Sequence, residues 1–350
     1  MEQVEGKQTG GRGVTPRGSW NCCGISALLL FLSDSEASST VAWRNHSTVT
    51  EFILTGLSDN PQTEALLFVL FLEIYVLTVT GNLTMLLVIR VDSHLHTPMY
   101  FFLSNLSFLD LCFSSVTVPK LLEDLLSEKK TISLEGCLTQ VFFVFVTAGT
   151  EAFLLSMMAY DRYAAICYPL LYGQMMSNEL CVKLVLLSWG LASLNSVVIL
   201  LLAVNLDFCE AQTIHHYTCE LPSLFPLSCS DVSVNRDILI GSTLLHGLGT
   251  FLPIFFSYAR IVSAVLSMSS TTGRNKAFNT CSSHLTAVVL FFGSGLVCYL
   301  MPTSGSSLDF LSLQYSAVIP MLNPLIYSLK NQEVKAAVRR TLGKCLHYFG

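Results

Sequence analysis

Seven apolar segments run through this chain, and they constrain its fold more than any other feature. They cover residues 66–89, 99–122, 138–158, 180–204, 238–262, 277–301 and 311–327. A helix of about 20 residues, rising about 1.5 Å per residue, crosses the hydrocarbon core of a bilayer. The segments lack the alternation of apolar and polar residues that marks membrane strands. We therefore predict an all-α membrane protein, a seven-transmembrane helix bundle.

The composition excludes a soluble globular protein. Hydrophobic residues make up 52% of the chain and charged residues only 12%, whereas soluble domains carry about 25% charged residues. Too few charges remain to cover a water-exposed surface, so lipid must be the solvent for much of the chain. The sequence has no block of basic residues, and we expect no nucleic-acid partner.

The loops between the segments differ in charge on the two sides of the predicted membrane. Basic residues gather on one side, at Arg90, Arg162, Lys183, Arg260, Arg274, Lys276, Lys330, Lys335, Arg339 and Arg340. The other side holds most acids and also Lys120, Lys129, Lys130 and Arg236. Because an excess of Lys and Arg marks the cytoplasmic face, the amino terminus is predicted to be extracellular. A glycosylation sequon at Asn45 supports this orientation.

The chain divides into three parts around this bundle. Residues 1–60 are predicted to form an extracellular tail, and 1–40 a disordered extension, because residues 6–18 are polar and Gly-rich. The short apolar run at 25–32 suggests a signal-peptide core as the alternative, but it lies late and its flanks match poorly. Residues 61–330 form the transmembrane domain. Residues 331–350 form a cytoplasmic tail, predicted to hold a short basic helix along the inner leaflet.

Four motifs mark the second, third, sixth and seventh segments. They are LHTPMYFFLS at 95–104, MAYDRYAAIC at 158–167, KAFNTCSSHL at 276–285 and PMLNPLIYSL at 320–329. With this set, residues 45–348 resemble the vertebrate olfactory receptors, a branch of the rhodopsin-like (class A) G-protein-coupled receptors. The resemblance implies a multi-pass plasma-membrane receptor for a small volatile odorant. It also implies coupling to a heterotrimeric G-protein of the stimulatory olfactory type, which raises cyclic AMP.

The resemblance implies that the third segment ends in an activation switch, Asp161-Arg162-Tyr163. In the family, the arginine releases its neighbouring acid and reaches into the crevice that accepts the G-protein. The alternative is an interfacial ion pair that only anchors the helix. By the same resemblance, the switch also includes Tyr258, His284, Asn323, Pro324 and Tyr327.

Two acids, Asp110 and Glu151, lie deepest in the predicted helices. A charge at the bilayer centre costs at least about 2.5 kcal/mol, so neither is expected to face lipid. The resemblance places them beside Asn82 and Asn323 in the family's sodium pocket, and we expect a sodium ion there in the inactive state. The alternative is a protonated, hydrogen-bonded pair without a metal. No other cofactor is expected, and Glu73 in the first segment has no predicted role.

Asn82 begins a second glycosylation sequon, but its side-chain amide lies inside the first apolar segment. We predict that it is buried in the membrane and hydrogen-bonds another helix.

Four cysteines are predicted to form two disulfides in the outer loops. The resemblance pairs Cys137 with Cys219 and Cys209 with Cys229, which ties the long second outer loop over the bundle. Spacing alone leaves the connectivity of these four cysteines open. In the tail, Cys345 is a candidate for palmitoylation, with a free thiol as the alternative.

The family's ligand pocket lies in the outer half, among the third, fifth, sixth and seventh helices. The matching positions are Val141, Val144, Phe145, Ala148, Gly149, Ser242, Thr243, His246, Phe292, Gly295, Tyr299, Leu313 and Ser316. For each of them, ordinary helix packing is the alternative. Together they describe a small apolar cavity with a few hydroxyls and one imidazole, which suits a neutral or weakly polar volatile. Val144 stands where amine receptors of the wider superfamily keep an acid, which disfavours a biogenic amine.

Other classes of function find little support in the sequence. The chain has no Gly-rich phosphate loop, no His-Glu-x-x-His zinc motif and no Gly-x-Ser-x-Gly elbow, so we do not expect an enzyme. A transporter would show internal repeats and discontinuous helices, and no repeat is visible. A non-olfactory receptor of the same superfamily is the remaining alternative, and the long outer loop with its extra cysteines argues against it.

Overall fold

A computed structural model describes residues 49–349 apart from 59, 209–211 and 301–311. The predicted disordered extension 1–40 and the sequon at Asn45 therefore lie outside the described residues. Cys209 also lies outside the described residues, and the side chains of Tyr299 and Cys345 are not described.

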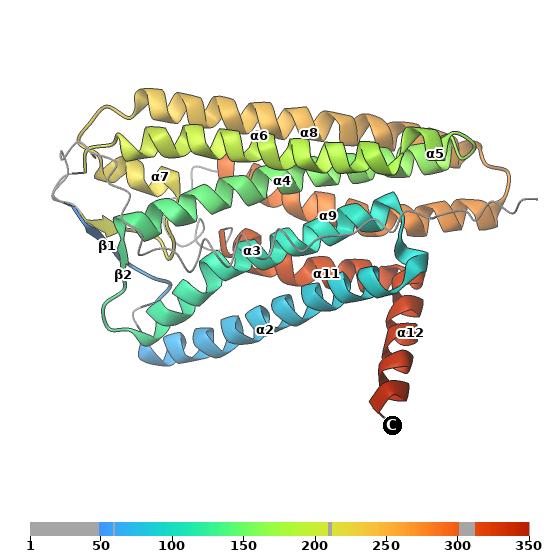
Figure 1. Cartoon of the computed structure of the whole chain (residues 1–350). Coiled ribbons are helices and arrows are strands. Elements are labelled where there is room, and N and C mark those ends of the chain that lie inside the picture. Colours follow the sequence, from blue (N-terminus) through green and yellow to red (C-terminus); the bar gives the residue numbers. More distant parts are fainter. Residues whose placement is uncertain (1–48, 59, 209–211, 301–311, 350) are drawn as a thin grey trace, which may run out of the picture. The chain divides into compact units, whose positions relative to one another are not determined.

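Five helices in the described part of the chain are long and apolar enough to cross a membrane. They are α2 (Pro61–Val91), α3 (Pro98–Leu126), α4 (Leu134–Cys167), α6 (Asn178–Val204) and α8 (Ser233–Ser267). The short helix α5 (Tyr172–Met175) directly precedes α6. The sixth spanning helix, α9 (Thr271–Leu300), has its apolar stretch at Cys281–Gly295. The seventh is α11 (Ile319–Lys330), which continues from the π-helical turn η3 (Gln314–Val318). Figure 1 shows these helices running side by side, which confirms the predicted bundle.

Local sequence signals fix where these helices begin. Asn60 caps α2 by accepting a hydrogen bond from the Gln62 backbone N–H at 2.9 Å, and Pro61 occupies the first helical turn. Ser133 caps α4 in the same way. Prolines at 119, 253 and 324 lie inside α3, α8 and α11. Neighbouring helices tolerate such breaks in a membrane bundle because they satisfy the freed backbone groups.

The outward faces of the helices are apolar, as lipid contact requires. Leu66 on α2, Leu186 on α6 and Leu245 on α8 are 73%, 66% and 72% exposed. Polar groups such as Asn82, Asp110 and His284 are instead buried between helices. This distribution is the reverse of that in a water-soluble protein and agrees with a lipid-embedded bundle.

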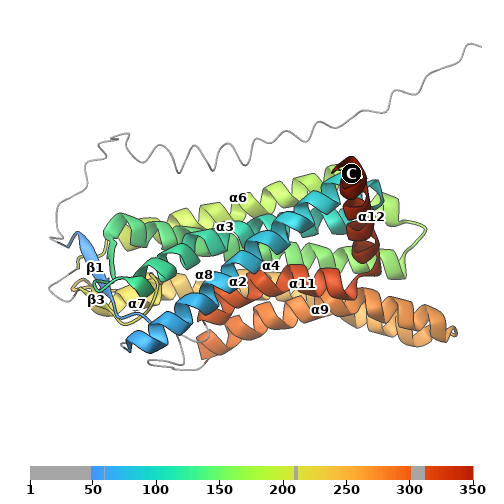
Figure 2. The ribbon, with the colours of Figure 1, turned by 90° about the horizontal axis from the view of Figure 1, so that it is seen from below.

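A three-stranded sheet covers one end of the bundle, in the order β2 (Thr131–Ser133), β1 (Glu51–Leu54), β3 (Thr213–Ile214). The central strand β1 pairs antiparallel with β2 and parallel with β3. Phe52 and Leu54 point inward and are almost fully buried, and the Phe52 ring packs edge-to-face on Phe208 at 5.2 Å. Residues 51–54, within the predicted outer tail, are thus part of the folded outer end (Figure 2).

The opposite end carries a short turn, η1 (Ser93–Leu95), and the last helix, α12 (Gln332–Phe349). Arg340 on α12 contacts the Asp92 carboxylate at 2.7 and 2.8 Å. Tyr100 on α3 donates a hydrogen bond to Glu333 at 2.7 Å. Hydrogen bonds from His94 and then from Arg340 lower the pKa of the Asp92 carboxyl to about 2. The predicted basic helix of the tail is therefore present and is anchored to the bundle.

Candidate functional site

The Asp161–Arg162 pair lies at the end of α4 nearest α12, and it is not a close ion pair. Arg162 Nε is 3.7 Å from the Asp161 carboxylate and has no hydrogen-bond partner among the described residues. Asp161 is almost fully buried and accepts a hydrogen bond from the Tyr172 hydroxyl at 2.7 Å. The acid is thus held by a residue of α5, which leaves the arginine loosely attached.

Tyr172 is a residue that the sequence did not single out. It follows Asp161 by 11 positions and lies beyond the end of α4, so no helical spacing relates the two residues. The aromatic ring of Tyr163 faces the same inner loop and packs on Tyr160 and Tyr168 with ring centroids 6.0 and 5.5 Å apart.

His284 on α9 joins three helices at this end of the bundle. Its imidazole is fully buried; Nε2 lies 2.9 Å from the Leu155 carbonyl oxygen on α4, and Nδ1 lies 2.8 Å from the Tyr258 hydroxyl on α8. A carbonyl oxygen can only accept a hydrogen bond, so Nε2 must carry a proton. In the neutral ring, Nδ1 then accepts from Tyr258. The imidazole therefore ties the inner end of α9 to α4 and α8.

The inner end of α11 brings Tyr327 into the same buried cluster. The Tyr327 side chain is 1% exposed, and its hydroxyl has no hydrogen-bond partner in the part of the chain that the structure describes. Pro324 packs close to α2, because a Cβ on Gly81 would lie 3.0 Å from the proline ring. Buried polar atoms are almost always hydrogen-bonded. Tyr327 Oη and Arg162 Nε are thus two unsatisfied polar atoms at the inner end of the bundle.

A second polar cluster lies deeper between the helices. Asn323 Nδ2 donates to both oxygens of the Asp110 carboxylate, at 3.2 and 3.1 Å. Asn82 Nδ2 donates to the Pro320 carbonyl oxygen at 3.0 Å, which confirms the predicted amide contact between helices. Glu151 is buried as well. The Oδ1 atoms of Asn82 and Asn323 have no hydrogen-bond partner among the described residues.

No group of three or more His, Cys, Asp and Glu side chains that could hold a metal ion occurs in the described parts of the chain. A cation bound here would depend on the two orphaned amide oxygens besides the carboxylates. Hard cations prefer oxygen ligands of this kind.

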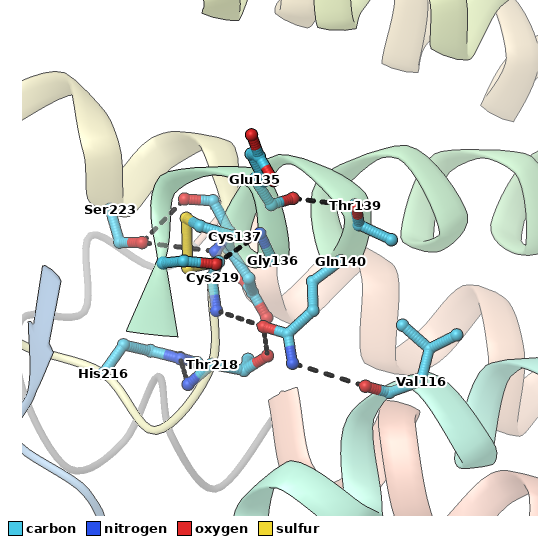
Figure 3. Close-up of a disulfide and its surroundings, with 12 residues drawn as sticks. Val116, Glu135, Gly136, Cys137, Thr139, Gln140, His216, Thr218, Cys219 and Ser223 are labelled. Carbon is cyan, nitrogen blue, oxygen red and sulfur yellow. Dashed lines mark hydrogen bonds between the residues drawn. A yellow bond between two sulfur atoms is a disulfide. The ribbon is translucent and has the colours of Figure 1, made fainter. Parts of the chain in front are cut away.

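The predicted Cys137–Cys219 disulfide is present and anchors the second outer loop on the start of α4. Figure 3 shows that Gln140, one turn further along α4, points its amide at the same loop. Its Oε1 accepts hydrogen bonds from Thr218 Oγ1 and from the Cys219 backbone N–H, both at 3.1 Å. Its Nε2 donates to the Val116 carbonyl oxygen at 3.3 Å. Gln140 therefore reinforces the disulfide and joins it to α3.

Of the second predicted disulfide, the structure describes only one of the two cysteines. Cys229 is disulfide-bonded, while its predicted partner Cys209 lies outside the described residues.

The predicted ligand-contact residues do not all face one space. Most are half-buried, namely Val144, Phe145, Ala148, Ser242, Thr243, His246, Phe292 and Gly295. Val141 is fully buried in the cluster below the outer loops. The His246 ring packs edge-to-face on Phe153 of α4 at 5.9 Å, so α8 presents His246 to the bundle. The Phe292 ring packs against Phe251 of α8 at 5.4 Å.

Four of these residues are engaged elsewhere. A Cβ on Gly149 would lie 3.0 Å from Ala192 Cβ, so Gly149 faces α6. Ser242 donates its hydroxyl proton to the Asn195 side chain on α6 at 2.7 Å.

The other two lie on the seventh helix. Leu313 packs into the cluster formed by α2 and α3, and Ser316 lies 2.9 Å from the Tyr217 hydroxyl of the outer loop. Helical spacing predicted a common face within each helix, but the neighbouring elements that cover that face decide which residues remain for a ligand.

Comparisons with known proteins agree on one family. A family model described as olfactory receptor matches residues 71–345. Olfactory receptor 8S1 of Homo sapiens is 66% identical over 296 residues, covering 84% of this chain and 82% of that protein. Olfactory receptor 5F1 of Homo sapiens is 48% identical over 307 residues, covering 86% and 97% of the two chains.

Among solved structures, the crystal structure of squid rhodopsin superimposes with a TM-score of 0.65. The match covers 82% of this chain and 83% of the squid rhodopsin chain. The two sequences are 18% identical, a level that supports the fold alone.

Proposed function

The chain belongs to the olfactory receptor family, and from that premise we propose that it binds a small volatile odorant and raises cyclic AMP through a stimulatory olfactory-type G-protein. It is a multi-pass plasma-membrane protein of the G-protein-coupled receptor class and not an enzyme. Family membership also removes the two alternatives, a transporter and a non-olfactory receptor.

The observation that carries the proposed mechanism is the unsatisfied cluster at the inner end of the bundle. Arg162 Nε and the Tyr327 hydroxyl are buried without hydrogen-bond partners among the described residues, while His284 ties α9 to α4. We assign this arrangement to the resting state. When an odorant binds in the outer half, α9 releases the His284 contacts and moves outward. Arg162 then leaves Asp161 and reaches into the opened crevice.

The exposed inner surface next to this cluster suits a protein partner. Leu170 is 98% exposed, and its neighbours Tyr168 and Leu171 are 44% and 48% exposed. They lie just beyond α4, close in sequence to Arg162, at the inner end of the bundle. An apolar patch in water usually marks a binding surface. We therefore place the G-protein contact on this patch and the crevice beside it.

The proposed ligand site is the half-buried set on α4, α8 and α9, without the four residues engaged elsewhere. His246 and Thr243 supply its polar groups, and Val144, Phe145 and Phe292 supply most of its apolar surface. Such a lining favours a small ligand with at most one or two polar groups. The absence of an acid at Val144 disfavours an amine.

A cyclic AMP reporter assay against a panel of volatiles tests the proposed function. Cells that express the receptor should respond to some neutral or weakly polar volatiles, and cells that express Arg162→Ala should not. Responses carried entirely by another second messenger would contradict the proposed G-protein type. A receptor that binds an odorant and leaves the G-protein unchanged would contradict the coupling itself.

His284→Ala is expected to raise cyclic AMP in the absence of odorant. The change removes two interhelical hydrogen bonds, each of which contributes about 0.5–1.5 kcal/mol. A loss of about 1–3 kcal/mol shifts the ratio of resting to active receptor by roughly 5- to 150-fold. The measurement is basal reporter activity, normalised to receptor at the cell surface.

Ser283→Ala is the matched control for this change. Ser283 is a buried neighbour on the same helix and makes no side-chain hydrogen bond to another described residue. Its basal activity should equal that of the wild type. If the two variants raised basal activity equally, the effect would come from loosened packing of α9, and the role given to the imidazole would be wrong.

We also propose that a sodium ion binds between Asp110 and Glu151 in the resting state. The fit rests on the orphaned Oδ1 atoms of Asn82 and Asn323, which lie in the same buried cluster and supply the neutral oxygens that a small cation needs. When bound, the ion would supply positive charge that offsets the two carboxylates. Because it binds the resting arrangement, it opposes activation.

Sodium should therefore lower the apparent affinity for odorant. At ten times its dissociation constant, a ligand of the resting state shifts the equilibrium by roughly tenfold. The measurement is the odorant concentration for half-maximal activation of purified receptor with G-protein, in sodium chloride against choline chloride at equal ionic strength. Asp110→Asn should abolish the difference between the two salts. An equal response to both salts in the wild type would support the protonated pair instead.

A further inference from the structure

Glu73 is a carboxyl group on the side of α2 that faces away from the bundle. Its side chain is exposed, and its neighbours Leu72, Val76 and Leu77 are 41%, 50% and 53% exposed. Together these four residues line a shallow hollow of about 410 Å³ on the helix surface. In a bilayer, this surface meets lipid or another membrane protein.

The depth of Glu73 makes lipid a poor neighbour. The apolar segment 66–89 is centred between Leu77 and Thr78, so Glu73 lies about 7 Å from its centre at the rise of an α-helix. The hydrocarbon core is about 30 Å thick, which puts the residue about 8 Å inside its boundary. A glutamate side chain is too short to reach the headgroups from that depth. Acids at such positions almost always have a polar or charged partner.

Three other acids near or within the membrane helices have partners inside the protein. Glu64 contacts Lys130 at 2.5 Å, Asp110 accepts from Asn323, and Asp161 accepts from Tyr172. Glu73 makes no hydrogen bond or ion pair to any other residue that the structure describes. The opposite side of α2 packs on α3 and α11, and the helix lies at the edge of the bundle (Figure 1). The part of the chain that the structure describes therefore offers Glu73 no partner, and a helix outside the bundle can supply one.

A second copy of α2 is not a suitable partner. The basic residue on α2, Arg90, lies at the inner end of the helix, so a symmetric pair of α2 helices would bring two Glu73 carboxyl groups together. Like charges in a low-dielectric medium disfavour that arrangement. A carboxylate at this depth is complemented best by a lysine or arginine on a partner helix.

The rest of the face permits close approach of another helix. Thr80 and Thr84 follow Glu73 by 7 and 11 positions, which places them on the same side, and both are exposed. Each hydroxyl donates to a carbonyl oxygen of its own helix at 2.7 Å. Short side chains of this kind are enriched where membrane helices pack.

We propose that this side of α2, the Glu73 face formed by Leu72, Glu73, Val76, Leu77, Thr80 and Thr84, docks a transmembrane helix of another membrane protein. That helix carries a lysine or arginine at the depth of Glu73. The interaction is lateral, lies within the membrane, and is separate from both the odorant site and the G-protein surface.

Designed helices provide the direct test. Labelled receptor in phosphatidylcholine vesicles is mixed with leucine-alanine helices of about 24 residues that carry either one lysine or one leucine at the matching depth. Energy transfer should show that wild-type receptor binds the lysine helix about tenfold more tightly than the leucine helix, a difference of about 1.4 kcal/mol. Glu73→Leu and Glu73→Gln should lose this preference. Glu73→Lys should instead prefer a helix that carries glutamate.

Glu64→Gln is the control, because it removes the other acid of α2 while leaving the Glu73 face intact; it should keep the preference. Glu73→Leu places an apolar side chain in lipid, so the variant is expected to fold. The proposal is overturned if the wild type does not distinguish the two helices, or if Glu73→Gln keeps the full preference. It is also overturned if receptor–receptor energy transfer depends on Glu73 while the lysine helix is ignored, which would identify a second copy as the partner.

Discussion

Replacing Arg162 with alanine is expected to abolish the odorant-driven rise in cyclic AMP while leaving the receptor at the cell surface. The arginine side chain is 14% exposed and lies at the inner end of α4, 3.7 Å from Asp161. In the proposed mechanism, its guanidinium group leaves this acid and enters the crevice that receives the G-protein. Truncating one partner of a buried charged contact costs about 2–5 kcal/mol, or roughly 30-fold to several thousand-fold. The measurement is a full odorant dose–response curve with surface immunostaining of the same cells.

Arg90→Ala separates this effect from a general loss of cytoplasmic positive charge. Arg90 is an exposed arginine in the last turn of α2. Both variants lower the basic count of the inner face by one, so any effect on orientation in the membrane should be equal. Only Arg162→Ala should lose signalling. If a surface-expressed Arg162→Ala receptor signalled fully, the Asp161–Arg162 pair would only anchor the helix. That is the alternative that the sequence leaves open.

The helices could be predicted from the sequence because the bilayer imposes one simple rule on all of them. Each spanning segment must be long, apolar and hydrogen-bonded within itself. The predicted segment 66–89 therefore lies inside α2, and 180–204 nearly coincides with α6. The strand β1 is different, because its four residues carry no long pattern. Its partners β2 and β3 lie far away in the chain, and only the folded outer loops bring them together.

The candidate site was predictable where a motif names the residue. Arg162, His284 and Tyr327 all belong to such motifs, and the structure brings them to the inner end of the bundle. Tyr172 and Gln140 belong to none of the four motifs. Their roles arise from loops that fold back on α4, and such contacts leave no periodic signal in the sequence.

The sequence predicts which residues share a face of a helix, but it does not predict which element packs on that face. Gly149 shares a helix with Phe145 and Ala148, but α6 approaches so closely that a Cβ on Gly149 would touch Ala192. Glu73 shows the same limit from the other side. Its depth follows from the sequence, whereas its outward direction depends on how α2 packs against α3 and α11.

Breaking the Cys137–Cys219 disulfide is expected to remove most of the receptor from the cell surface. The bond closes a loop with a sequence separation of 82 residues. Closing a loop of that size contributes about 4–5 kcal/mol in the chain-entropy account. Typical domains are stable by only about 5–15 kcal/mol, so Cys137→Ala should lower surface receptor by about tenfold or more. The measurement is surface staining of an epitope-tagged receptor, together with the melting temperature of the purified fraction.

The double variant Cys137→Ala/Cys219→Ala decides why the receptor is lost. If the bond itself matters, the double variant should be no worse than either single variant, because both remove the same interaction. If an unpaired thiol causes mispairing, the double variant should recover. Cys112→Ala removes a buried free thiol and should lower surface receptor much less.

Gln140 would still hold Thr218 and the Cys219 backbone after the bond is lost. The small surviving fraction should therefore still respond to odorant, and a complete loss of response in that fraction would show that the disulfide also shapes the ligand site.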